Sequence, residues 1–149
     1  MKRLTHPSHL ADWKARLREE RPAARKTVVV SSGTCGQASG SLGIIDAFRG
    51  EIERRGLADE VRLETTGCHG FCELEPSVVI QPRGVVYKNL RPEDVPAIVE
   101  ETLLGDRVIP SLVFEDPATG HHAELQKDIP FYGKQLRLLD SCLIFLVRI

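Results

Sequence analysis

The sequence lacks the features that would place this chain outside the ordinary globular proteins. Its longest uninterrupted apolar run, residues 142–147, is far shorter than the roughly 18 residues that a membrane span requires. The first residues, MKRLTHPSH, contain no apolar stretch of the kind that a secretory signal has. We therefore expect a cytoplasmic protein that does not insert into a membrane.

Surplus positive charge and abundant cysteine are also missing. Lys and Arg number 20 and Asp and Glu 21, for a formal net charge of −1, so there is no excess of cations to neutralise phosphates. Four cysteines in 149 residues are too sparse for a disulfide scaffold. In a reducing compartment, clustered cysteines are more often metal-binding or catalytic. We therefore expect no nucleic-acid partner, and the cysteines become the residues of interest.

The hydrophobic pattern divides the chain into three parts. Residues 1–25 contain an amphipathic helix, with Leu10, Trp13 and Leu17 at helical spacing. Residues 26–108 form the second part, whose apolar runs are short and separated by turn residues. Residues 109–149 show little periodicity. We expect the first two parts to fold without the third, and a chain that ends near residue 116 to keep its α/β content.

The second part has a clear order of predicted elements. The β-branched run 27–30 predicts a buried strand, and the spacing over 41–55 predicts a helix. Three further strands and a second helix follow, and the last two strands carry a hairpin signal between them. Their bounds are 61–64, 77–80, 85–87 and about 92–104. The order strand, helix, strand, strand, strand, helix predicts an α/β architecture of the thioredoxin-like kind.

Three of the four cysteines follow predicted strands. Cys35 comes after the strand 27–30, and Cys68 and Cys72 come after the strand 61–64. If these strands are parallel neighbours joined by a right-handed crossover, their carboxyl ends meet on one side of the sheet. The two cysteine loops would then face each other. Glycines beside the cysteines would let the backbone approach closely and aim N–H groups at sulfur, as an iron–sulfur cluster needs; they are Gly33, Gly36, Gly67 and Gly70.

Several kinds of cysteine chemistry compete for this pattern. Three residues separate Cys68 from Cys72, so the C-x-x-C dithiol of disulfide exchange is absent. Phosphate chemistry at Cys35 would need a cation to hold the anion, and residues 27–48 contain neither Lys nor Arg. Structural zinc stays open, since three cysteines and a histidine close a tetrahedral site, although His69 directly adjoins Cys68. Inert buried thiols also stay open.

Residues 30–42, 66–80 and 87–99 resemble a thioredoxin-like [2Fe-2S] ferredoxin domain. More closely, the chain is similar to the N-terminal region of the NADH-oxidising flavoprotein subunits of complex I-type dehydrogenases and NAD(P)-linked hydrogenases, which shares the segments 116–120 and 129–137. The resemblance implies an electron-transfer module whose [2Fe-2S] cluster is ligated by Cys35, Cys68 and Cys72, bound to the other subunits of an NAD(P)H-linked oxidoreductase. The alternatives are a cluster-free docking domain and a structural zinc domain.

The sequence departs from this resemblance in two places. Such domains hold their cluster with four cysteines, whereas Ser31 stands here where an earlier cysteine is expected. The alternatives are an oxygen ligand from Ser31 or Ser32, a weak site of three cysteines, or a domain that has lost the cluster and kept the fold. After residue 139 the resemblance ends, and Cys142 is not assigned to the site. Residues 109–149 are accordingly expected to be a linker and the truncated start of a flavin-binding domain. FMN and NAD sites are expected downstream, so this chain would hold no complete catalytic site.

Overall fold

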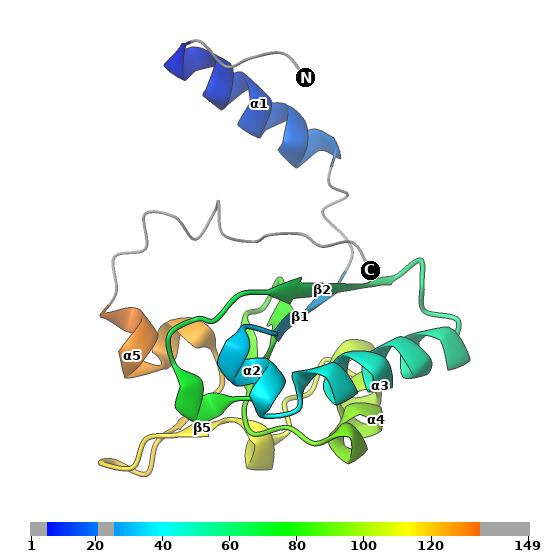
Figure 1. Cartoon of the computed structure of the whole chain (residues 1–149), viewed down its shortest axis with the longest axis vertical. Helices are drawn as coiled ribbons and strands as arrows, with labels where there is room; N and C mark the ends of the chain where they lie inside the picture. Colours follow the sequence, from blue (N-terminus) through cyan, green and yellow to red (C-terminus); the bar gives the residue numbers. More distant parts are fainter. Residues whose placement is uncertain (1–5, 21–25, 135–149) are drawn as a thin grey trace.

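A four-stranded mixed sheet forms the centre of the computed structural model, which describes residues 6–20 and 26–134 (Figure 1). The strands lie in the order β2-β1-β3-β4. Strand β1 (Lys26–Ser31) pairs in parallel with β2 (Val61–Thr66) and antiparallel with β3 (Val78–Gln81). Strand β3 pairs antiparallel with β4 (Val85–Tyr87). The predicted strands and hairpin are confirmed, and the parallel pairing brings the carboxyl ends of β1 and β2 to one edge.

Helices α3 (Ser41–Arg54) and α4 (Val95–Ile98) cover one face of this sheet (Figure 1). Because alternate residues of a strand face opposite sides, Val28 and Val30 point to this face and pack in the same core as Ile44 and Phe48 of α3. The helix predicted over 41–55 is thus confirmed. Its apolar face forms the main core.

The segment predicted as one helix from residue 92 is made of three different helical turns. A 3₁₀ turn η2 (Pro92–Asp94) leads into α4, and a π-helical segment η3 (Val99–Leu104) follows it. The Gly105 N–H donates to the Glu100 carbonyl at 3.0 Å, across five residues. The side chain of buried Thr102 hydrogen-bonds inward to the Tyr87 hydroxyl at 2.6 Å. Periodicity alone does not distinguish such turns.

The described residues beyond 109 pack on both faces of the sheet: Leu112 and Val113 join the main core, and most of those that follow cover the opposite face. This part contains η4 (Pro110–Leu112), the short paired strands β5 (Phe114–Glu115) and β6 (His122–Ala123), η5 (Gln126–Asp128) and α5 (Pro130–Gly133). Most of its buried side chains pack in a second core with those of β1, β3 and β4; this core includes Val29, Val79, Val86, Ala123, Ile129 and Tyr132. This shared core argues against the expectation that the first two parts fold without the third, which stays untested. Contacts between residues far apart in the sequence, rather than local periodicity, place residues 114–132 against the sheet.

Helix α1 (Pro7–Glu20) confirms the predicted N-terminal helix and lies apart from both faces of the sheet (Figure 1). Leu10 is 58% exposed and Trp13 41%. The next described residue, Lys26, begins β1, and its ammonium donates to the Leu103 carbonyl at 2.6 Å and to Asp106 at 2.7 Å. In the described part of the chain, no helix combines the length and the hydropathy that a membrane crossing demands.

Candidate metal centre

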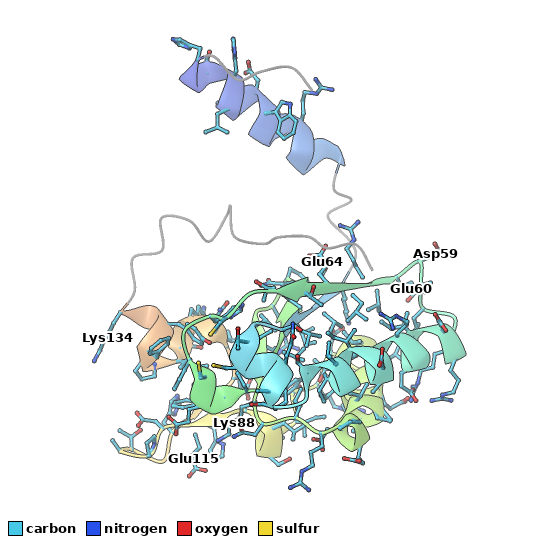
Figure 2. The ribbon with its side chains drawn as sticks, in the orientation of Figure 1. Asp59, Glu60, Glu64, Lys88, Glu115 and Lys134 are labelled. Atoms are coloured by element: carbon cyan, nitrogen blue, oxygen red, sulfur yellow. The ribbon has the colours of Figure 1, made fainter. Side chains whose placement is uncertain are left out.

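Cys35, Cys68 and Cys72 lie together at the edge where β1 and β2 end. Cys35 belongs to a short helix α2 (Thr34–Ala38), in a segment predicted as a loop, and Cys72 begins the 3₁₀ turn η1 (Cys72–Leu74). The Sγ atoms of Cys68 and Cys72 are 3.7 Å apart, and the Cys72 thiol also hydrogen-bonds to Cys35. All three are exposed, and sulfur atoms gather beside α2 in Figure 2. The structure thus brings the predicted cysteines together, while their role as ligands stays a prediction.

Backbone contacts hold the two cysteine loops against each other. The Ser32 N–H donates to the Thr66 carbonyl at 2.9 Å, which continues the parallel pairing one residue beyond the strands. A Cβ atom on Gly33 would come within 2.8 Å of the Cys68 backbone nitrogen. Only glycine permits so close an approach. Gly33 thus permits the predicted close approach of the two loops, while its part in cluster binding stays a prediction.

The other glycines differ in how far the structure requires them. Gly70 has a φ of 85°, and its N–H donates to the Cys68 sulfur at 3.2 Å. A Cβ atom on Gly36 would lie 2.6 Å from the Ser31 carbonyl oxygen. A Cβ atom on Gly67 would meet nothing within 4 Å. The geometry thus explains glycine at positions 36 and 70 but gives no reason for it at position 67.

The thiols interact strongly enough to change the acidity of one of them. Hydrogen bonding to the Cys35 thiol, and then to the Cys68 thiol, raises the pKa of Cys72 to about 11. At neutral pH the Cys72 thiol is therefore protonated in the metal-free chain. Since a metal binds the thiolate, metal binding at Cys72 must release this proton.

Ser31 does not have the environment of a metal ligand. It is 1% exposed, and its hydroxyl donates to Oε1 of Glu75 at 2.5 Å. The other carboxylate oxygen of Glu75 accepts the Ser77 N–H at 3.0 Å. Ser32 is half-buried, and its oxygen accepts the Ser41 hydroxyl at 3.1 Å. Glu75 was not predicted as part of the site. The sequence signal that could have revealed it is its position, since it is an acidic residue shortly before the buried apolar run 78–80.

An aromatic cluster that the sequence did not predict lies against the second cysteine loop. The ring of Phe71, between Cys68 and Cys72, lies 4.5 Å from that of Phe131, 5.8 Å from Phe114 and 6.1 Å from Tyr132, measured between centroids. The His69 ring lies edge-on to Tyr132 at 6.3 Å. No local pattern reveals this cluster, because its members are distant in sequence.

The spacing of Cys68 and Cys72 fits two thiolate ligands of one tetrahedral metal ion. Within residues 6–20 and 26–134, no group of three or more His, Cys, Asp and Glu side chains is arranged to hold one metal ion. A [2Fe-2S] cluster divides its ligands between two irons. Two thiolates on one tetrahedral metal, with metal–sulfur bonds of about 2.3 Å, lie about 3.8 Å apart. The Cys68–Cys72 separation of 3.7 Å fits such a pair.

Comparison with known proteins agrees with this geometry. The family model for thioredoxin-like [2Fe-2S] ferredoxins matches residues 17–103. A 2Fe-2S ferredoxin of Clostridium pasteurianum is 39% identical over 72 residues, covering 48% of this chain and 71% of the relative. One of Aquifex aeolicus is 38% identical over 82 residues, covering 54% and 73%.

Solved structures agree as well. The wild-type thioredoxin-like [2Fe-2S] ferredoxin of Aquifex aeolicus matches with a TM-score of 0.58 and 31% identity, over 63% of this chain and 100% of that one. Two further structures of that protein carry serine in place of one or the other of two cysteines four residues apart, which is the spacing of Cys68 and Cys72. Because the family model spans both cysteine loops and every strand of the central sheet, we conclude that the chain belongs to the thioredoxin-like [2Fe-2S] ferredoxin family, which implies a [2Fe-2S] cluster and electron transfer.

Proposed function

We propose that this chain is an electron carrier whose [2Fe-2S] cluster is bound by Cys35, Cys68 and Cys72. The observation that carries the proposal is the meeting of three thiols from two loops at one exposed edge of the sheet. A cluster held by cysteine thiolates takes up and releases electrons at a potential that its surroundings set. The exposure of the three cysteines would allow an electron-transfer partner to come close.

The donor groups of this chain fit three positions of such a site. Cys68 and Cys72 have the separation expected of two ligands on one metal ion, and Cys35 adds a third thiol from the other loop. The Gly70 N–H already points at the Cys68 sulfur, and such hydrogen bonds stabilise charge on a thiolate and raise the reduction potential. For the fourth position we propose Ser32 rather than Ser31, because the Ser31 hydroxyl donates to buried Glu75 whereas the Ser32 oxygen accepts from Ser41.

Anaerobic reconstitution with iron and sulfide tests the function. The full chain is expected to bind about two irons and to show a visible ferredoxin-like absorption. Cys68→Ala or Cys72→Ala is expected to abolish both, because a site short of one thiolate does not tolerate the loss of another, whereas Cys142→Ala serves as the control and leaves them unchanged. Stoichiometric zinc without a visible band would favour the zinc domain. A colourless, metal-free chain would favour the docking domain.

We further propose that the chain works with other subunits of an NAD(P)H-linked oxidoreductase. The segments 116–120 and 129–137 support this proposal, because they resemble flavoprotein subunits beyond residue 103, where the family match ends. Purification of the tagged chain from its native cell is expected to recover a subunit that contains FMN. The purified chain alone is expected to bind no FMN, since its sequence contains neither G-x-G-x-x-G nor G-x-x-x-x-G-K-[ST]. Stoichiometric FMN on the isolated chain would contradict this assignment.

A further inference from the structure

The second cysteine loop is packed against residues outside the family match. Phe71 lies between Cys68 and Cys72 in the sequence and contacts an aromatic group formed by Phe114, Phe131 and Tyr132, which we call the aromatic cap. Phe131 also contacts Tyr132, with ring centroids 5.2 Å apart. All three cap residues lie beyond residue 103, where the match ends. A part of the chain that the family pattern does not include therefore contacts the cysteine site.

The aromatic cap is itself fixed to the central sheet. Tyr132 is 8% exposed and packs in the second core, together with fully buried Ile129. The Val86 N–H donates to the Glu124 carbonyl at 3.0 Å, and the Gln126 N–H to the Gly84 carbonyl at 2.8 Å. These bonds join residues 124–126, which lie between Phe114 and Phe131 in the sequence, to β4 and the turn before it. Lys88 in turn places its ammonium 5.8 Å from the centre of the Phe114 ring (labelled Lys88 in Figure 2).

The cysteine loop has little regular structure of its own. Between the end of β2 at Thr66 and the start of η1 at Cys72 there is no helix or strand. The Gly70 N–H bond to the Cys68 sulfur is local, whereas the contacts of Phe71 reach an anchored part of the fold. Offset and edge-on aromatic contacts add to the apolar burial that already favours this packing.

We propose that the aromatic cap is a positioning element for the cysteine site. Through Phe71 it fixes the loop that carries Cys68 and Cys72, so that their sulfurs stay near the spacing of metal ligands before a metal binds. Phe71 and Phe131 are then positioning residues and not ligands. The effect on a bound cluster rests on the proposed function, but the effect on the loop does not.

Alkylation of the metal-free chain tests the loop directly. The full chain is treated with iodoacetamide under reducing conditions, and the rate at each cysteine is measured by peptide mass mapping. We expect Phe131→Leu to raise the rates at Cys68 and Cys72 by about two- to tenfold, the equivalent of one aromatic contact. Phe131→Tyr is expected to keep the normal rates.

Phe48→Leu provides the matched control. It removes the same ring from the core on the opposite face of the sheet, so it is expected to lower the melting temperature without changing the cysteine rates. Equal rates in wild type and Phe131→Leu would overturn the proposal, and so would equal increases in Phe131→Leu and Phe48→Leu. Should Phe131→Leu fail to fold, Phe114→Leu is tested in its place.

A second measurement separates this proposal from the proposed function. In the reconstituted protein, Phe131→Leu is expected to speed the loss of visible absorption in air and to shift the midpoint potential, whereas Phe48→Leu leaves the potential unchanged. Faster alkylation in a chain that never binds iron would support the cap and contradict the electron-carrier function. A cluster that forms normally, with unchanged alkylation rates and potential, would contradict the cap alone.

Discussion

Two neighbouring serines at the end of β1 have different surroundings. Ser31 is buried against the carboxylate of Glu75, and Ser32 lies one residue further along, where the backbone joins the other loop. We predict that Ser32→Cys gives a reconstituted cluster with a longer lifetime in air, because thiolate is a better iron ligand than a hydroxyl. The decay of visible absorption measures this.

Ser31→Cys is the control for that substitution. It places a thiol against buried Glu75 and removes the strong hydroxyl donor to Oε1. We expect it to lower stability, since a buried carboxylate oxygen loses its partner, and to add nothing to the lifetime of the cluster. A longer-lived cluster in Ser31→Cys and not in Ser32→Cys would contradict the proposal that Ser32 holds the fourth position and would favour Ser31.

Cys72 should show an unusual pH dependence in the metal-free chain. Hydrogen bonding to Cys35 and Cys68 favours the protonated thiol and raises its pKa to about 11 from an ordinary 9.0. Because the thiolate is the reactive form, we predict that alkylation at Cys72 still increases between pH 9 and pH 11. Cys35→Ala removes the hydrogen bond that raises the pKa of Cys72 the most, so the increase in alkylation rate should move to lower pH. A midpoint near 9.0 in the unaltered chain would contradict the prediction.

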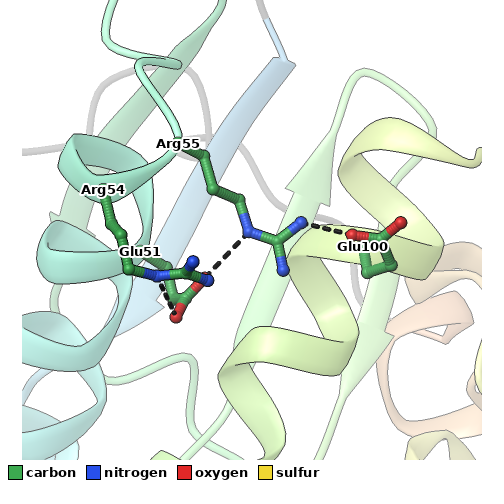
Figure 3. A network of polar contacts seen from close by, with 4 residues as sticks. All are labelled: Glu51, Arg54, Arg55 and Glu100. Carbon is green, nitrogen blue, oxygen red and sulfur yellow. Dashed lines mark hydrogen bonds and ion pairs between the residues drawn. The ribbon is translucent and has the colours of Figure 1, made fainter.

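Among the elements, α3 and η3 are joined by a network of ion pairs (Figure 3). Glu51 accepts from Arg54 at 2.6 Å and from Arg55 at 2.9 Å, and Arg55 also donates to Glu100 on η3. The side chain of Glu51 is only 14% exposed. The hydrogen bond from Arg54, together with that from Arg55, lowers the pKa of Glu51 against the opposing effect of burial.

A lowered pKa in the folded state gives stability that is present above the ordinary pKa of 4.5 and is lost as the pH falls below it. We predict that Glu51→Gln lowers the free energy of unfolding by about 1 kcal/mol at pH 7. The difference should vanish as acid protonates Glu51 in the unaltered chain. Urea unfolding of both proteins at pH 7 and at a pH well below 4.5 measures this difference in the free energy of unfolding.

Asp46→Asn is the matched control on the same helix. Its carboxylate pairs with Arg49 at 2.8 Å but is 72% exposed, so we expect almost no change in stability at either pH. A pH-independent loss in Glu51→Gln would show that packing, rather than charge, is responsible.

The sequence predicted the elements whose residues follow a regular period. Short apolar runs bounded by turn residues located every strand of the central sheet, and the 3.6-residue period located α3. It missed α2, because a five-residue helix with a glycine inside has no period to show. It also missed Glu75 and the aromatic cap, since these contacts join residues far apart in the chain. The meeting of the cysteines was predictable because it follows from strand order alone.

In the whole molecule, the sheet has two buried faces, and residues 114–132 provide the cover for one of them. Val29, Val79 and Val86 would become exposed without that cover. Burying a valine contributes about 1.5–3 kcal/mol, and net stabilities are about 5–15 kcal/mol. We predict that a chain ending at residue 109 unfolds at a much lower temperature than the full chain, or does not fold. Circular dichroism during heating measures this, with a chain ending at residue 134 as the control.

The direction of β1 has a consequence for attaching the protein to a surface. The strand begins at Lys26, which is fixed to the Leu103 carbonyl and Asp106, and ends at Ser31 beside the cysteine loops. Its five residue steps of about 3.3 Å separate the two ends by about 16 Å. In a chain anchored to an electrode by a tag before α1, the attachment would reach the sheet at Lys26, the end of β1 that is far from the cysteine loops. The exposed edge with Cys35, Cys68 and Cys72 lies at the opposite end of that strand, so a soluble redox mediator is expected to carry current to it better than the anchor does.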